Sequence, residues 1–104
     1  MKLMTKEIEK QLPALYSTEN IKTENKVVVV KYFTPFSSWT WYGVEYDPKE
    51  KLFFGWVVGF EKGWGYFSLD EFEEVNKDSP VLKIERDMYF KPTKISDLED
   101  WKNK

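Results

Sequence analysis

The sequence predicts an α+β fold, with an antiparallel sheet of four to five strands and two to three short helices packed on it. Apolar runs rich in valine and aromatic residues, separated by turn segments, predict the strands. Two Ser-x-x-Glu patterns in the second half predict helix starts. The 104 residues suit a single globular domain over 1–104, so one set of strands and helices shares one fold.

The first part of the chain predicts a helix and then a buried strand. Thr5 can cap a helix that carries Ile8 on its apolar face, and Pro13 ends or kinks it. Residues 17–26 are polar and predict a loop. Residues 26–33, K-V-V-V-V-K-Y-F, hold four consecutive valines, which is typical of a central strand that is apolar on both faces.

The middle of the chain predicts an antiparallel hairpin. Residues 39–46 and 52–60 read as two strands, and the D-P-K-E-K between them suits a tight turn with Asp47 and Pro48 at its first two positions. A shorter strand is expected over 65–67, after the glycine-containing turn K-G-W-G.

The last third predicts a helix, a strand and a second helix. The capping box S-L-D-E at 68–71 indicates a helix over 68–76. The alternating run 81–90 indicates a last strand, with Leu82 on its apolar side. The S-x-x-E spacing recurs at 96–99 and predicts a short terminal helix through Trp101.

Several distinctive sequence words occur in one order between residues 12 and 92. They are L-P-A-L-Y, then F-T-P-x-S-x-W-T-W-Y-x-x-E-x-D, F-F-G-x-V-x-G-x-E, G-Y-F-S-L-x-E and I-E-R-D-x-x-F-x-P. In these words the chain resembles the bacterial domain of unknown function 2958 family. The resemblance implies a small protein encoded on plasmids or integrative elements, near replication, transfer or antirestriction genes. It implies no catalytic residues, and Gly63 stands where the family pattern suggests an acidic residue.

The composition excludes several kinds of chemistry. The chain has no cysteine and no histidine, so thiolate nucleophiles, Ser-His-Asp catalysis and Cys- or His-ligated metals are not available within it. We therefore expect a non-enzymatic protein with no metal and no cofactor. A formal charge of -2 argues against a nucleic-acid partner. The lack of a signal-like or membrane-spanning apolar run predicts a cytoplasmic protein.

The hairpin register predicts a candidate site. If the D-P-K-E-K loop closes the hairpin, Tyr42, Val44 and Tyr46 lie on a core face, and the opposite face forms a shallow trough of tryptophans above glycines. The opposed pairs on that second face are Trp39 with Gly59, Trp41 with Val57, Gly43 with Gly55, and Glu45 with Phe53. The candidate partner- or ligand-binding residues are Trp39, Trp41, Gly43, Glu45, Gly55, Gly59, Glu61 and Trp64. The alternatives are that the glycines serve packing, or that a one-residue slip reverses the faces.

Three functions follow from this trough and its surroundings. The first is a small binding or regulatory protein that uses the aromatic and glycine-rich hairpin face to bind a protein partner, in a mobile-element or host-defence setting. The second is a small-ligand-binding or carboxylate-dependent hydrolytic protein that uses the same trough with Glu45 and Glu61. The third is an inhibitor of a nucleic-acid-binding protein that presents the acidic surface of the 68–76 helix to a basic partner.

Overall fold

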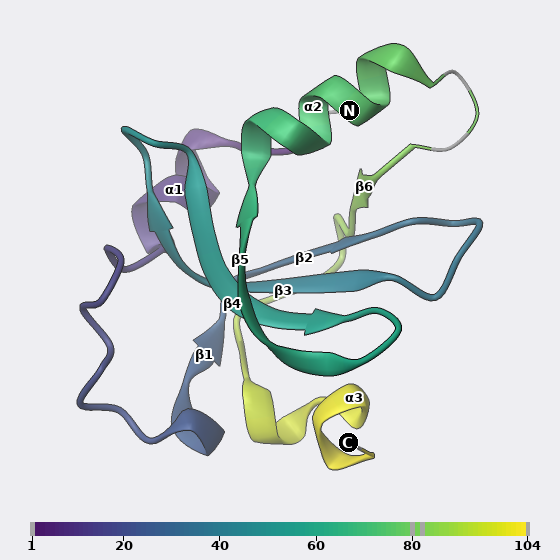
Figure 1. Ribbon diagram of the computed structural model, residues 1–104. Coiled ribbons are helices and arrows are strands. Elements are labelled where there is room, and N and C mark those ends of the chain that lie inside the picture. The colour runs from purple at the N-terminus through teal and green to yellow at the C-terminus, as the bar shows by residue number, and fades with distance from the viewer. Residues whose placement is uncertain (1, 80, 82, 104) are drawn as a thin grey trace.

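Five antiparallel strands form the main sheet of the protein, in the order β5-β4-β3-β2-β6 (Figure 1). The computed structural model describes residues 2–79, 81 and 83–103. The strands of the main sheet are β2 (Val30–Phe33), β3 (Thr40–Asp47), β4 (Leu52–Val58), β5 (Lys62–Ser68) and β6 (Glu85–Arg86). A second, two-stranded sheet pairs β1 (Val27–Val28) with β7 (Thr93–Lys94).

Short helices surround the sheets. The α-helices are α1 (Lys6–Gln11), α2 (Leu69–Asp78) and α3 (Glu99–Lys102), and the 3-10 turns are η1 (Thr23–Asn25) and η2 (Ile95–Asp97). The predicted α+β class, with a five-stranded antiparallel sheet, is therefore confirmed. Across the described ranges, no helix is both long and apolar enough to pass through a membrane.

The main sheet carries an apolar core on each face, because alternate strand residues point in opposite directions. Figure 1 shows α2 on one side of the sheet and α3 on the other. The core on the α2 side includes Tyr32, Phe53, Phe67, Leu69 and Phe72. The core on the η2 and α3 side includes Val28, Tyr42, Val44, Trp56, Val58 and Ile95.

Two of the three predicted helix starts are confirmed by their caps. The Thr5 hydroxyl accepts a hydrogen bond from the Ile8 amide at 3.2 Å, and the Ser68 hydroxyl accepts one from the Glu71 amide at 3.2 Å. Each cap satisfies a donor that the helix itself leaves without a partner. The third cap is wrong. Ser96 lies in η2, whose Ile95 is fully buried, and α3 begins only after Leu98 without a side-chain cap.

The predicted strand over 26–33 is split in two. Val29 separates β1 from β2, and its amide donates to the Gly43 carbonyl at 2.9 Å. The two halves then serve different sheets: β1 pairs with β7, and β2 lies between β3 and β6. Four valines in a row indicate burial, but they do not specify which partner each half of the run takes.

Two other strands differ in length from the prediction. The strand predicted over 81–90 is reduced to the two residues of β6, and Leu82 lies outside the described residues. Just before β6, the Asn76 side chain of α2 provides the hydrogen bonds to Ile84 that a neighbouring strand would otherwise provide. Asn76 accepts from the Ile84 amide at 2.7 Å and donates to the Ile84 carbonyl at 2.8 Å. Conversely, β5 extends beyond the predicted 65–67 and pairs with β4 along its whole length.

Candidate functional site

A β-bulge at Val44 changes the predicted hairpin register. From Thr40 to Gly43 the pairing is as predicted, with Gly43 opposite Gly55. Beyond the bulge, Glu45 lies opposite Phe54 rather than Phe53, and Tyr46 moves to the other face. A bulge adds one residue to one strand and so reverses the side-chain alternation that follows it. The predicted position of Glu45 beside the tryptophan trough is therefore wrong.

Two of the predicted trough glycines are enclosed by packing. A Cβ atom on Gly55 would lie 1.8 Å from the Tyr42 carbonyl oxygen, and one on Gly43 would lie 2.8 Å from Val30 Cγ1. These glycines let neighbouring strand atoms approach more closely than any side chain would permit. Gly43 and Gly55 are buried, so they form no open floor for a ligand.

Part of the predicted trough forms an aromatic cluster at one end of the sheet, together with Phe60, which was not a predicted site residue. We call Trp39, Trp41, Gly59 and Phe60 the aromatic tip. The Trp39 and Trp41 rings stack with their centroids 5.8 Å apart, and the edge-on Phe60 ring lies 5.5 Å from Trp39. Gly59 lies directly beneath Trp39, since a Cβ atom there would be 2.4 Å from the indole ring. Figure 1 shows the β2–β3 and β4–β5 connections, which supply Trp39 and Phe60, projecting from the same end of the sheet.

One part of the aromatic tip packs against α2, and another part is exposed to solvent. Trp41 packs against Phe72 of α2 at a centroid distance of 4.9 Å, and Trp39 and Trp41 are both half-buried. The Phe60 ring is 95% exposed. Large aromatic side chains on a rigid support, with one face open to solvent, are typical of protein-binding surfaces.

Acidic residues border the aromatic tip. Glu61 is exposed in the β4–β5 turn, where its carbonyl accepts from the Gly59 amide at 3.0 Å. The helix that carries Phe72 exposes four carboxylates: Asp70, Glu71, Glu73 and Glu74. Asp70 forms an exposed ion pair at 3.3 Å with Lys51 of the β3–β4 turn, at the other end of the sheet from the tip. The tip therefore lies next to Glu61 and on the side of the sheet that carries the acidic helix α2.

Trp64 does not belong to the aromatic tip. It lies opposite Trp56 in the β4–β5 pairing, which places its ring on the face covered by α3. There it stacks on Phe54 with the centroids 5.4 Å apart, and it meets Trp101 edge-on at 6.0 Å. The predicted site residue Trp64 therefore lies on the opposite face of the sheet from Trp41, because its pairing with Trp56 sets the side of its ring.

Glu45 instead forms a buried polar network with the segment before β1. One of its carboxylate oxygens accepts from the Tyr16 amide at 2.7 Å, and the other accepts from the Thr18 amide at 3.2 Å and from the Thr18 hydroxyl. Lys26 Nζ donates to the Thr18 carbonyl at 2.5 Å and to the Thr18 hydroxyl at 2.7 Å. Glu45, Thr18 and Lys26 are all buried. Tyr16 has a φ of 69°, which is uncommon for a bulky residue, and its hydrogen bond to Glu45 holds it there.

Sequence reasoning missed this network. Thr18 and Lys26 belong to a polar stretch that reads as a solvated loop, and Glu45, the partner of Thr18, is 27 residues further along the chain. The one available signal was the lysine at the boundary between a polar loop and an apolar strand.

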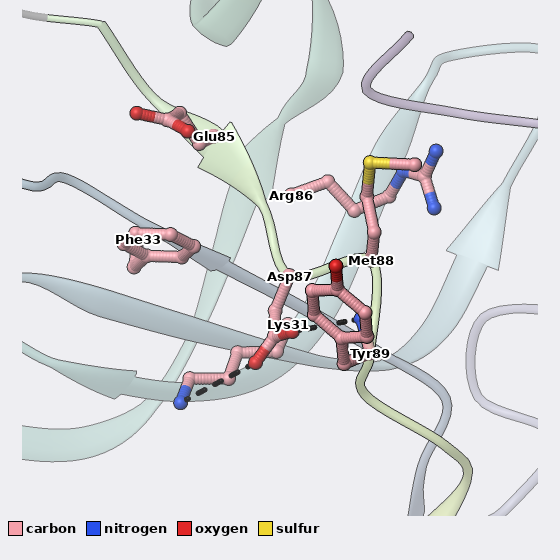
Figure 2. A pocket seen from close by; sticks show the side chains of 7 residues that line it. All are labelled: Lys31, Phe33, Glu85, Arg86, Asp87, Met88 and Tyr89. Carbon is pink, nitrogen blue, oxygen red and sulfur yellow. Dashed lines mark hydrogen bonds and ion pairs between the residues drawn. The ribbon is translucent and has the colours of Figure 1, made fainter. Parts of the chain in front are cut away.

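A pocket of about 320 Å³ lies at the β2–β6 edge, where Lys31 and Asp87 meet (Figure 2). Lys31 Nζ lies 3.9 Å from an Asp87 carboxylate oxygen, and the Asp87 amide donates to the Lys31 carbonyl at 2.9 Å. The other Asp87 oxygen accepts from the Tyr89 amide at 2.9 Å. Arg86 extends away from this pair, and its Nε donates to the Lys2 carbonyl. Asp87 is thus held by structural contacts, which argues against a role as a general base.

The carboxylates of the described chain do not gather into a metal site. No group of three or more acidic residues lies close enough together there to hold an ion. Asp47 caps its own turn by accepting from the Lys49 amide at 3.0 Å, as its position in the D-P-K-E-K turn suggested.

A family model described as Protein of unknown function (DUF2958) matches residues 3–103. The chain belongs to this family. The resemblance seen in the sequence words is thereby confirmed, and the match covers both the aromatic tip and the Glu45 network of this DUF2958 protein. No curated protein and no solved structure matches the chain.

The surroundings of three tyrosines of the DUF2958 protein raise the pKa of the phenol above its ordinary value. Burial raises the pKa of Tyr32, whose hydroxyl donates to the Leu3 carbonyl at 2.6 Å. Burial, followed by a 2.5 Å hydrogen bond to Asp100, raises the pKa of Tyr42. Burial raises the pKa of Tyr46 to about 12. These phenols are neutral at physiological pH, so they act as hydrogen-bond donors or packing groups.

Proposed function

We propose that this protein is a small, non-enzymatic binding protein that docks a protein partner through its aromatic tip. The observation that carries the proposal is the almost fully exposed Phe60 ring, which packs edge-on against the half-buried Trp39. An exposed phenylalanine next to tryptophans on a rigid sheet offers a large apolar contact area at little cost in side-chain entropy. Interface energy is concentrated in such aromatic clusters.

The proposed partner presents an apolar side chain surrounded by basic residues. The apolar part would contact Phe60 and the open edges of Trp39 and Trp41. Basic residues around it would face Glu61 and the exposed carboxylates of α2, of which Glu71 and Glu73 flank Phe72 in the sequence. Opposite charges around an apolar centre accelerate association and select the partner.

The same acidic residues connect partner binding with the third predicted function, inhibition of a nucleic-acid-binding protein. A basic partner could be a nucleic-acid-binding protein, whose phosphate-binding residues the α2 carboxylates would occupy. The family resemblance supports a gene carried on a mobile genetic element, and such partners would then be proteins of the host or of the element. The ligand-binding alternative is less well supported, because Glu45 and Glu61 do not share a trough.

The test compares two exposed aromatic residues at different places. Phe60 and Tyr89 are 95% and 93% exposed, so changing either to serine should leave the fold intact. Tagged wild-type protein, Phe60→Ser and Tyr89→Ser would be used to capture proteins from lysate of the host cell, with mass spectrometry of the bound fraction. A partner retained by the wild type and by Tyr89→Ser, but lost with Phe60→Ser, would then be purified.

Direct titration completes the test. Tryptophan fluorescence of the purified pair should give a Kd that rises at least about tenfold for Phe60→Ser, as for the loss of an interface aromatic residue. A charge-reversed α2 variant, Glu73→Lys, should slow association. Equal capture by wild type and Phe60→Ser, or a Kd that changes with Tyr89→Ser instead, would contradict the proposal.

A further inference from the structure

A second cavity of about 450 Å³ is separate from both the aromatic tip and the Lys31–Asp87 pocket. It is bounded by parts of the 11–29 segment, by Val44 of β3 and by Pro92. Its lining is largely aliphatic, and the polar side chains among the lining residues are Gln11, Thr18 and Lys26. A volume of this size lies within the range of about 300–1,000 Å³ that small-molecule sites occupy, and apolar walls with few polar groups are typical of them.

The charge at this cavity has one sign. Lys26 supplies a cation, and no Asp or Glu is among the described residues that line it. Lys26 is only 6% exposed, and none of the ion pairs of the described residues includes it. Glu45 reaches it only indirectly, through the Thr18 hydroxyl. A buried charge without a directly paired counter-ion is costly.

The Lys26 ammonium group also has one unused hydrogen-bond donor. An ammonium group carries three hydrogens. Two of them are directed to the Thr18 carbonyl and the Thr18 hydroxyl, and no third acceptor is found among the described protein groups. An anion in the cavity would therefore meet an ammonium group whose nearest carboxylate, Glu45, is separated from it by the Thr18 hydroxyl, and would accept a hydrogen bond from its remaining donor.

We propose that this cavity binds a small organic carboxylate with an apolar body. The carboxylate would accept the third hydrogen bond of Lys26, and the hydrocarbon part would pack against Val29, Val44 and Pro92. A neutral amide of the same shape would keep the apolar contacts and lose the charge-assisted hydrogen bond. A hydrogen bond to a charged group is worth about 1.5–3 kcal/mol, which corresponds to roughly tenfold or more in affinity.

The test uses hexanoate and phenylacetate as probes, with hexanamide and phenylacetamide as neutral counterparts. Each would be titrated into the 104-residue protein and followed by amide nitrogen–proton NMR. We expect shifts at Val27, Val29 and Val44, and a Kd about tenfold or more lower for each carboxylate than for its amide. Lys26→Met keeps a similar volume in the buried site and should abolish the difference. The exposed Lys22 gives a matched control, since Lys22→Met should preserve it.

A second variant guards against misfolding of Lys26→Met. Ile21 lines the cavity and is 43% exposed, so Ile21→Glu should fold and place a negative charge beside the site. It should weaken hexanoate binding and leave hexanamide binding nearly unchanged. Equal affinities for carboxylate and amide, shifts confined to Trp39 and Phe60, or no shifts at about 10 mM probe would each overturn the proposal. Binding in Phe60→Ser should equal that in the wild type, so this result is independent of the proposed partner surface.

Discussion

Replacing Glu45 tests whether the buried network holds the fold together. Its carboxylate accepts two backbone amides and one hydroxyl, all from the segment that contains Tyr16 and Thr18. Glu45→Ala would leave these donors without an acceptor and Lys26 buried without its indirect counter-charge. Removing one partner of a buried charged network costs about 3–5 kcal/mol. That is a large fraction of the roughly 5–15 kcal/mol by which domains are stable.

The assay is urea unfolding at pH 7, followed by far-ultraviolet circular dichroism. Glu50→Ala, in the exposed β3–β4 turn, is the matched control and should change the unfolding free energy by no more than about 0.5 kcal/mol. Adding Lys26→Met to Glu45→Ala should cost less than the sum of the single changes by about 1 kcal/mol or more, because the residues share Thr18. A loss below about 1 kcal/mol for Glu45→Ala would refute the reasoning, since three charged hydrogen bonds cannot be worth so little.

Three further predictions concern α2, the tyrosines and the aromatic tip. Asn76→Ala should lower the unfolding free energy by about 1–3 kcal/mol in urea, because both backbone groups of Ile84 lose their partner. Burial raises the pKa of Tyr46 from 10.0 to about 12, so the unfolded chain loses that proton first. Stability should be full below pH 10 and fall as the pH rises through about 12, and Tyr46→Phe should reduce this fall in alkaline urea titrations. Gly59→Ala should displace the Trp39 ring and change tryptophan fluorescence, whereas Gly63→Ala, with nothing within 4 Å of its added Cβ, should change it little.

The parts of the fold that the sequence predicted correctly depend on neighbours along the chain. The caps at Thr5 and Ser68 involve amides three residues away, and the first half of the hairpin follows from a short turn. Such local patterns leave few alternatives. Ser96 shows the limit of such patterns. Its spacing to Glu99 suits a helix cap, but Ser96 lies in a 3-10 turn that buries Ile95 and precedes α3.

The candidate site was predicted only in part, because its other half depends on distant contacts. Trp39, Trp41 and Gly59 come together as the alternation indicated. The position of Glu45 depends on the bulge at Val44, and a prediction that assumes strict alternation of side chains along the strand does not include a bulge. It also depends on amides of a loop that is remote in the sequence. Phe60 was passed over, since a residue at the end of a predicted strand gives no sign of being exposed.

The bulge at Val44 also limits how the length of this protein can vary. Deleting Val44 would remove the bulge and restore simple alternation in β3, with Glu45 still opposite Phe54, but it would also remove a buried side chain from the core on the α3 side. A single deletion would thus open a cavity in that core, next to the buried Glu45 network. Within the family, insertions and deletions should therefore fall in the turns on either side of β3, at 34–39 and 48–51, while the number of residues in β3 itself stays fixed.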